Sequence, residues 1–146
     1  MTRKATIILV DDHTIVRSGL KAIIQAKPGG SRYKVVAEAG SFEQGLELIQ
    51  QYQPDIAVID IQLSGRDGIE LAQEISGSRT RAVICSIHQN FSYISRSFKA
   101  GAKGYIKKDS MPDDIYQCLA SVSEGRVYID RTLKDEYEEI GRHMNA

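Results

Sequence analysis

Short apolar runs alternate along this chain with stretches in which apolar residues recur at helical spacing. Runs of this length are typical of strands buried on both faces, and their alternation with helices indicates a parallel sheet built from βα units. We expect strands at about residues 5–10, 33–38, 55–60, 81–86 and 103–106. The sequence therefore predicts an α/β fold with a doubly wound, five-stranded parallel sheet.

An apolar stripe at helical spacing follows each predicted strand, within residues 16–24, 42–49, 69–75, 91–98 and 115–122. The last helix has the clearest start signal. Ser110 is a good N-cap, Pro112 suits the first turn, and Asp113 stands three residues after the cap. Two stretches rich in turn-forming residues, 28–31 and 64–68, are predicted loops.

The length of 146 residues allows one domain with a real core and excludes two domains of ordinary size. We assign residues 1–126 to this domain and residues 127–146 to a C-terminal linker or helical tail. Within the tail, apolar residues recur in steps of four, three and four, at Leu133, Tyr137, Ile140 and Met144. This narrow stripe suits a helix that packs on its own domain or on another chain, although it is too short for a stable coiled coil. A solvated, frayed tail is the alternative.

Composition excludes several classes of function. Lys plus Arg and Asp plus Glu number 19 each, so no overall field attracts nucleic acid or an anionic membrane. The chain has no apolar run long enough for a signal peptide or a membrane span, and we expect a cytoplasmic protein. Cys85 and Cys118 lack metal-ligand spacing and are predicted to be buried thiols.

Polar residues stand at the ends of four of the predicted strands. Asp11 and Asp12 follow the first strand, Asp60 and Ser86 close the third and fourth, and Lys108 follows the fifth. In an open parallel sheet the carboxyl ends of the strands share one edge, where ligands bind. The sequence therefore predicts that these five side chains converge in a phosphate-handling site.

Carboxylates brought together repel one another unless a cation joins them. Mg²⁺ binds one or two carboxylates and adds phosphate oxygens readily, whereas zinc prefers His or Cys, and only His13 and His88 stand near the strand ends. A carboxylate can attack phosphorus to give an aspartyl phosphate, while a metal ion and a lysine neutralise charge on the transferred group. Lys108 is the candidate for that lysine, and Ser86 is a candidate hydrogen-bond donor to a phosphoryl oxygen.

Each residue also has a simpler interpretation. Asp11 and Asp12 fit a helix N-terminus, Lys108 fits a solvated pair with Lys107, and Ser86 fits a satisfied core hydroxyl. Asp60 is the exception, because an unpaired carboxylate at the end of a strand buried on both faces is costly. The functional interpretation depends on the combination of residues.

The combination resembles the receiver domain of two-component response regulators, over about residues 5–125. Two segments, Asp11-Asp12-His13 with Val16-Arg17-Ser18-Gly19-Leu20 and residues 101–109, are similar to the NarL/FixJ subgroup, whose members usually carry a LuxR-type helix-turn-helix domain. The resemblance implies a flavodoxin-like (βα)5 fold.

The resemblance also implies roles for individual residues. Asp60 is the expected phosphoacceptor, and Asp12, Asp60 and the backbone carbonyl of Gln62 are the expected Mg²⁺ ligands. Asp11 would hold the ion through water. The remaining implied roles are a switch hydroxyl, a switch aromatic residue and a phosphate-binding lysine, at Ser86, Tyr105 and Lys108.

Three positions near the implied site are expected to tune reaction rates: Gln62, Ile87 and His88. The residue after the switch hydroxyl is often small in the family, but here it is Ile87. A bulky side chain there is predicted to slow phosphorylation by small donors or to slow hydrolysis. The residue after the lysine, proline in many receivers, is Asp109.

The leading hypothesis is a phosphoryl-accepting signalling switch that takes its phosphate from a histidine kinase. It would catalyse its own phosphorylation and dephosphorylation without being a conventional enzyme. Phosphorylation would draw Ser86 inward, let Tyr105 fill the space, and repack the fourth and fifth helices. Residues 96–108 contain five basic residues and no acidic one, which predicts a positive surface for an acidic partner or a dimer mate.

In a full-length protein the output would be transcription. No helix-turn-helix pattern follows Tyr137, so the chain is either a truncated regulator or a stand-alone receiver, and DNA binding would need the absent domain. A homodimer through helical faces is a further expectation.

Two other classes of function are open on the sequence alone. The first is a phosphorylation-independent interaction domain, which would have no need for Asp60, Ser86 and Lys108 together. The second is a metal-dependent phosphatase, whose general acid would stand at the position of Gln62, a residue that cannot donate a proton usefully. A dinucleotide site is disfavoured because no Gly-x-Gly-x-x-Gly follows the first strand.

Overall fold

The computed structural model describes residues 4–26, 31–110, 114–133 and 138. The predicted strands are confirmed to within about one residue. They are β1 (Ala5–Val10), β2 (Tyr33–Ala39), β3 (Ile56–Ile59), β6 (Arg81–Ser86) and β7 (Gly104–Lys107). All pair in parallel, in the order β2-β1-β3-β6-β7. The chain reverses its winding direction between β1 and β3, which is where open α/β sheets form ligand sites.

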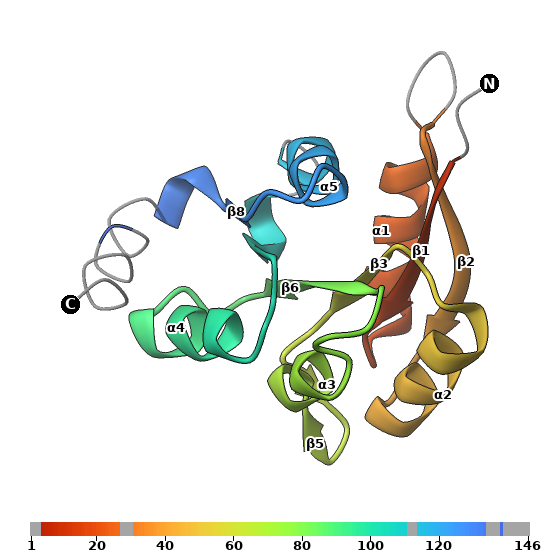
Figure 1. The fold of residues 1–146 in the computed structure, drawn as a ribbon, viewed down its shortest axis with the longest axis horizontal. Coiled ribbons are helices and arrows are strands. Elements are labelled where there is room, and N and C mark those ends of the chain that lie inside the picture. The colour runs from red at the N-terminus through yellow and green to blue at the C-terminus, as the bar shows by residue number, and fades with distance from the viewer. Residues whose placement is uncertain (1–3, 27–30, 111–113, 134–137, 139–146) are drawn as a thin grey trace.

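Helices cover both faces of the sheet (Figure 1). The helix α1 (Thr14–Gln25) and the helix α5 (Ile115–Ser123) lie on one face, and α2 (Phe42–Tyr52), α3 (Gly68–Glu74) and α4 (Phe91–Lys99) lie on the other. The sheet separates two apolar clusters. Alternate residues of a strand point to opposite faces, so Ile7 and Leu9 join the cluster under α1 and α5, and Ile8 and Val10 join the other. The predicted doubly wound architecture is confirmed.

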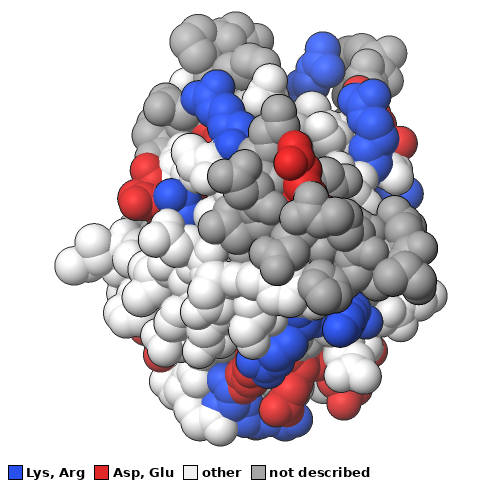
Figure 2. Space-filling view, turned by 90° about the vertical axis from the view of Figure 1, so that its left-hand side faces the viewer, with Lys and Arg blue, Asp and Glu red and all other residues white. Residues whose placement is uncertain are grey.

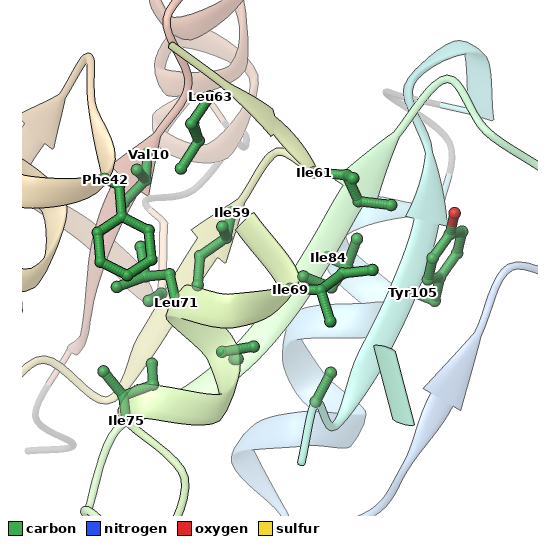
Figure 3. Packing of buried hydrophobic residues seen from close by; sticks show 14 of the residues in the cluster. Val10, Phe42, Ile59, Ile61, Leu63, Ile69, Leu71, Ile75, Ile84 and Tyr105 are labelled. Atoms are coloured by element: carbon green, nitrogen blue, oxygen red, sulfur yellow. The ribbon is translucent and has the colours of Figure 1, made fainter. Parts of the chain in front are cut away.

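The larger cluster fixes the helices that surround the carboxyl edge of the sheet. In Figure 3, Phe42 from α2 and Leu71 from α3 pack beside Val10 of β1, while Ile69 lies against Ile84 of β6. These side chains are almost fully buried. Tight packing of this kind leaves the strand ends little freedom to move independently of one another.

A sixth strand, β8 (Tyr128–Ile129), extends the sheet in parallel beyond β7. The prediction of five strands is therefore one short, because a two-residue strand is too short to show a period. Leu133, in the following 3₁₀ helix η2 (Arg131–Leu133), is buried in the core beside Tyr105. The domain boundary at residue 126 stays a prediction.

Two further details correct the sequence analysis. The N-cap of α5 is Asp114 rather than Ser110, which ends a 3₁₀ helix, η1 (Lys108–Ser110). Pro112 and Asp113 lie outside the described residues, as do Tyr137, Ile140 and Met144 of the predicted stripe. The loop predicted at 64–68 contains part of an antiparallel hairpin, β4 (Gln62–Leu63) and β5 (Arg66–Asp67), with Gly65 at a positive φ of 77° between its strands.

The positive surface predicted for residues 96–108 is not borne out for three of its five basic residues, which contact carboxylates. Arg96 forms an ion pair with Asp67 at 2.9 Å, and Lys108 points into the acidic cluster described below. The Lys107 ammonium lies 3.9 Å from the Asp109 carboxylate. Figure 2, which views the molecule from the α4 end, accordingly shows positive and negative side chains interspersed. Among the described residues, no helix is long and apolar enough to cross a membrane.

Candidate functional site

Three carboxylates meet at the carboxyl edge of the sheet, as the sequence predicts. Asp11 and Asp12 follow β1, and Asp60 follows β3, its neighbour in the sheet. One potential ligand atom from each of Asp11, Asp12, His13 and Asp60 lies within 4.8 Å of the others. Residues 49 positions apart therefore form one acidic cluster.

Lys108 closes this cluster from the far end of the chain. It follows β7, and its ammonium lies 2.9 Å from Asp60 Oδ2 and 3.0 Å from Asp11 Oδ2. The alternative of a solvated pair with Lys107 is excluded by this geometry. The lysine places a fixed positive charge against both buried carboxylates, which is the position from which it could neutralise an incoming phosphoryl group.

Burial shapes the electrostatics of the cluster. Asp60 and Asp11 are each only 5% exposed. Burial raises the pKa of Asp60 above its ordinary value, and the Asp11 carboxylate adds to this, although the hydrogen bond and charge of Lys108 act in the opposite direction. Burial alone would lower the pKa of Lys108, but hydrogen bonds and charges from Asp60 and Asp11 raise it. Lys108 is therefore cationic at neutral pH, in the midst of an excess of negative charge.

The donor set fits a hard divalent cation. Asp12 Oδ1 is buried and accepts no hydrogen bond within the described part of the chain; the nearest basic atom is His13 Nδ1, at 3.0 Å. Asp12 Oδ2 accepts a hydrogen bond from Ser64 Oγ at 3.1 Å. A buried carboxylate oxygen without a donor, beside two other carboxylates, is the environment that oxygen-seeking Mg²⁺ occupies. Gln62 stands next to these groups, and its backbone N–H donates to Asp60 Oδ1 at 3.4 Å.

Ser86 and Tyr105 are linked through the backbone of His88. Ser86 Oγ accepts a hydrogen bond from the His88 amide at 3.0 Å, and the Tyr105 hydroxyl donates to the His88 carbonyl at 2.8 Å. Tyr105 is fully buried, and Ser86 is 1% exposed. Burial raises the pKa of the Tyr105 hydroxyl, which therefore stays protonated and able to donate. The two hydrogen bonds therefore join Ser86 and Tyr105 to the same loop.

The other two residues expected to tune rates lie in the same loop between β6 and α4. Ile87 is 67% exposed. The His88 ring stacks on the Tyr93 ring of α4 with their centroids 4.1 Å apart, and His88 Nε2 is buried without a hydrogen-bond partner among the described residues. The loop is therefore joined to α4 by an aromatic contact, while Ile87 faces outward.

Sequence reasoning missed residues that support the cluster. Arg17 in α1 donates to the Asp11 carbonyl at 2.6 Å and pairs with Glu38 at 3.3 Å, which ties α1 and β2 to the site. Ser64, in the turn between β4 and β5, supports the cluster through its hydrogen bond to Asp12 Oδ2. The backbone at Gly68 passes so close to the Asp60 carbonyl that a Cβ would lie 1.9 Å from its oxygen. None of these contacts has a periodic or spacing signal, since they depend on how side chains and loops fold back onto the strand ends.

Comparison with known proteins agrees with this geometry. Residues 7–120 match the model of the response regulator receiver domain. The chain belongs to the response regulator receiver domain family.

Two curated relatives illustrate the subgroup. The nitrate/nitrite response regulator NarL of Escherichia coli is 32% identical over 131 residues, which cover 88% of this chain and 59% of NarL. The transcriptional regulatory protein MctR of Rhizobium johnstonii is 35% identical over 135 residues, covering 90% of this chain and 61% of MctR. The chain thus spans about three fifths of the length of these relatives.

Solved structures support the same fold. A LuxR-family two-component response regulator from Aurantimonas sp. SI85-9A1 superposes with a TM-score of 0.85 at 36% identity, covering 93% of this chain and 96% of that one. The signal receiver domain of the response regulator NarL from Mycobacterium tuberculosis gives a TM-score of 0.78 at 28% identity. The superposition covers 86% of this chain and 100% of that domain. The chain is thus similar to NarL-type and LuxR-type regulators in both sequence and fold.

Proposed function

We propose that this receiver domain is a phosphoryl-accepting switch, and that the Asp60 carboxylate takes a phosphoryl group from a histidine kinase. One observation supports the proposal above all. The Lys108 ammonium bridges Asp60 and Asp11 at the edge of the sheet, beside an Asp12 oxygen that lacks a hydrogen-bond donor. Phosphoryl transfer needs a nucleophile, a fixed cation and oxygen ligands for a metal ion, and these residues supply groups of all three kinds.

In the proposed reaction an Asp60 carboxylate oxygen attacks phosphorus. A new oxygen–phosphorus bond forms as the bond between phosphorus and the kinase imidazole breaks, and the imidazole leaves with the electron pair. Lys108 and the Ser86 hydroxyl would bind the phosphoryl oxygens. Asp11, Asp12, Asp60 and the Gln62 carbonyl would hold Mg²⁺, which when bound supplies further positive charge to the transferred group.

The output would follow from the loop between β6 and α4. The added phosphoryl charge would draw Ser86 inward, and the His88 backbone would transmit this shift to Tyr105 and, through the stack on Tyr93, to α4. We expect the surface formed by α4, β7 and α5 to change its affinity for a partner, which includes a second copy of the chain. In a longer protein with a DNA-binding domain, the output would be transcription, and the switch would act in the cytoplasm.

Intact-mass spectrometry tests the proposal. The protein is incubated with acetyl phosphate or phosphoramidate, with and without Mg²⁺. The wild type and the variant Asp109→Ala, which loses an exposed carboxylate next to Lys108, should each gain one phosphoryl group in a Mg²⁺-dependent manner. Asp60→Ala should gain none. If neither small donors nor a panel of histidine kinases yields an adduct on the wild type, the phosphorylation-independent interaction domain becomes the better interpretation.

A further inference from the structure

Asp130 is a fully buried carboxylate outside the acidic cluster. It follows β8, on the part of the chain that the sequence analysis assigned to a tail, and its exposed fraction is 0%. A buried carboxylate is costly unless its oxygens are hydrogen-bonded, so its contacts indicate what it holds in place.

Those contacts reach both β7 and the start of η2. Asp130 Oδ2 accepts a hydrogen bond from the Lys107 amide at 3.0 Å. Asp130 Oδ1 accepts from the Thr132 amide at 2.9 Å and from Thr132 Oγ1 at 2.6 Å. The Asp130 amide donates to the Tyr105 carbonyl at 2.8 Å, and the Ser110 side chain also hydrogen-bonds to the carboxylate.

The carboxylate therefore continues the sheet where β8 stops. The last pair of β7 and β8 joins Tyr105 to Ile129, and the next free amide on β7 belongs to Lys107. Asp130 Oδ2 supplies the acceptor that a longer strand would have supplied with a carbonyl. Without it, the amide at the end of β7 would lose its partner.

Two of the residues that hydrogen-bond to Asp130, Lys107 and Ser110, flank Lys108 in the chain. Lys107 precedes Lys108 in the chain, and Ser110 closes the 3₁₀ helix that Lys108 opens. The Lys108 side chain is long and flexible, so a fixed backbone narrows the positions open to its ammonium, which contacts both Asp60 and Asp11. We propose that Asp130 is a positioning residue that holds Lys108 against the Asp60 and Asp11 carboxylates.

The charge state of Asp130 supports this role. Burial alone would raise its pKa, but the hydrogen bonds from Ser110, Thr132 and the Lys107 amide lower it below the ordinary value. The carboxylate is therefore ionised at neutral pH, and both of its oxygens accept. The proposal rests on the proposed function for its consequence in phosphoryl transfer, but the placement of Lys108 is testable without that reaction.

Mg²⁺ binding separates a positioning role from a merely structural one. The Lys108 ammonium occupies the carboxylates and repels a second cation, so Lys108→Ala should tighten Mg²⁺ binding about threefold or more. If Asp130 acts through Lys108, Asp130→Asn should also tighten binding, and the double variant should bind no tighter than Lys108→Ala. Mg²⁺ alone is titrated into each protein, and binding is monitored by the NMR chemical shift of the Gln62 backbone amide.

The control is Arg131→Ala, which loses an exposed neighbour of Asp130 that pairs with Asp114 and should leave Mg²⁺ affinity unchanged. Ser110→Ala removes only one contact and serves if Asp130→Asn fails to fold. The proposal would be overturned if the Asp130 and Ser110 variants bound Mg²⁺ more weakly than the wild type or equally well. It would also be overturned if Asp130→Asn changed Mg²⁺ affinity by the same factor in the wild type and in Lys108→Ala.

Phosphorylation gives a second readout. If the wild type accepts a phosphoryl group from acetyl phosphate, Asp130→Asn and Lys108→Ala should each slow the reaction, and the double variant should be no slower than Lys108→Ala. If the wild type accepts none, the proposed function fails, while the Mg²⁺ titration still decides whether Asp130 positions Lys108.

Discussion

Two buried aspartates in this domain experience opposite electrostatic environments. Burial and the Asp11 carboxylate raise the pKa of Asp60, while hydrogen bonds from Ser110, Thr132 and Lys107 lower that of Asp130. The fold therefore disfavours the ionised form of one carboxylate and favours that of the other. Asp60 belongs to a cluster of three carboxylates and one lysine, whereas both oxygens of Asp130 accept hydrogen bonds.

Replacement of each aspartate by neutral asparagine should shift the melting temperature in opposite directions. Asp60 has a raised pKa in the folded state, so its contribution to stability is largest at low pH and is lost as pH rises through that pKa. At pH 7 without Mg²⁺, Asp60→Asn should therefore raise the melting temperature, and the gain should shrink as the pH is lowered toward 4. Calorimetry in the presence of a chelator measures this.

Asp130→Asn is the matched comparison. Because the pKa of Asp130 is lowered in the folded state, its ionised form stabilises the fold at pH values above its ordinary pKa of 3.8. This stabilisation is lost as the pH falls through the folded-state pKa. This variant should melt at a lower temperature than the wild type at pH 7. A decrease in both variants would mean that Lys108 outweighs burial at Asp60, contrary to the electrostatics described above.

Ile87 allows a kinetic prediction at the residue scale. Its side chain is 67% exposed and directly follows Ser86 in the chain. Ile87→Ala should accelerate phosphorylation by acetyl phosphate or hydrolysis of the phosphoryl group, each followed by mass spectrometry over time. The prediction is wrong if both rates remain those of the wild type.

At the scale of elements, the loop between β6 and α4 is held from two sides. The Tyr105 hydroxyl of β7 donates to the His88 carbonyl, and the His88 ring packs on Tyr93 of α4. Since the His88 amide also donates to Ser86, one residue connects β6, β7 and α4. A local change at the proposed phosphorylation site would thus have a physical route to the helix surface.

Removing one hydroxyl should measure the strength of this connection. Tyr105→Phe loses the hydrogen bond to the His88 carbonyl and should lower the free energy of unfolding by about 1 kcal/mol. Tyr128→Phe is the control, because the Tyr128 hydroxyl is buried without a hydrogen-bond partner among the described residues, so its removal should cost nothing. Urea denaturation compares the two, and equal losses would show that Tyr105 does not anchor the loop.

At the scale of the whole molecule, the sequence predicted the sheet and the convergence of the site for one physical reason. Parallel strands place all their carboxyl ends on one edge, so Asp11, Asp12, Asp60 and Lys108 had to meet once the strands were identified. The order of the strands brings β1 and β3 together, and this places Asp60 next to the two other aspartates.

The features that escaped prediction lack such a rule. The strand β8 has two residues, too few to show a period, and Asp130 resembled any charged residue of a tail. Arg17 contacts Asp11 from α1, Ser64 contacts Asp12 from the turn between β4 and β5, and the partner of Arg96 is Asp67, on a different element. Charge counted along the sequence therefore misjudged the surface near α4.

The measurement that tests the central claim most directly is the location of the phosphoryl group. The protein is phosphorylated with acetyl phosphate and Mg²⁺, the acyl phosphate is reduced with borohydride, and the digested peptides are sequenced by tandem mass spectrometry. If Asp60 is the phosphoacceptor, a single homoserine should appear, at position 60, and none should appear without the phosphodonor. A homoserine at position 11 or 12, or a phosphate stable to borohydride on another residue type, would contradict it.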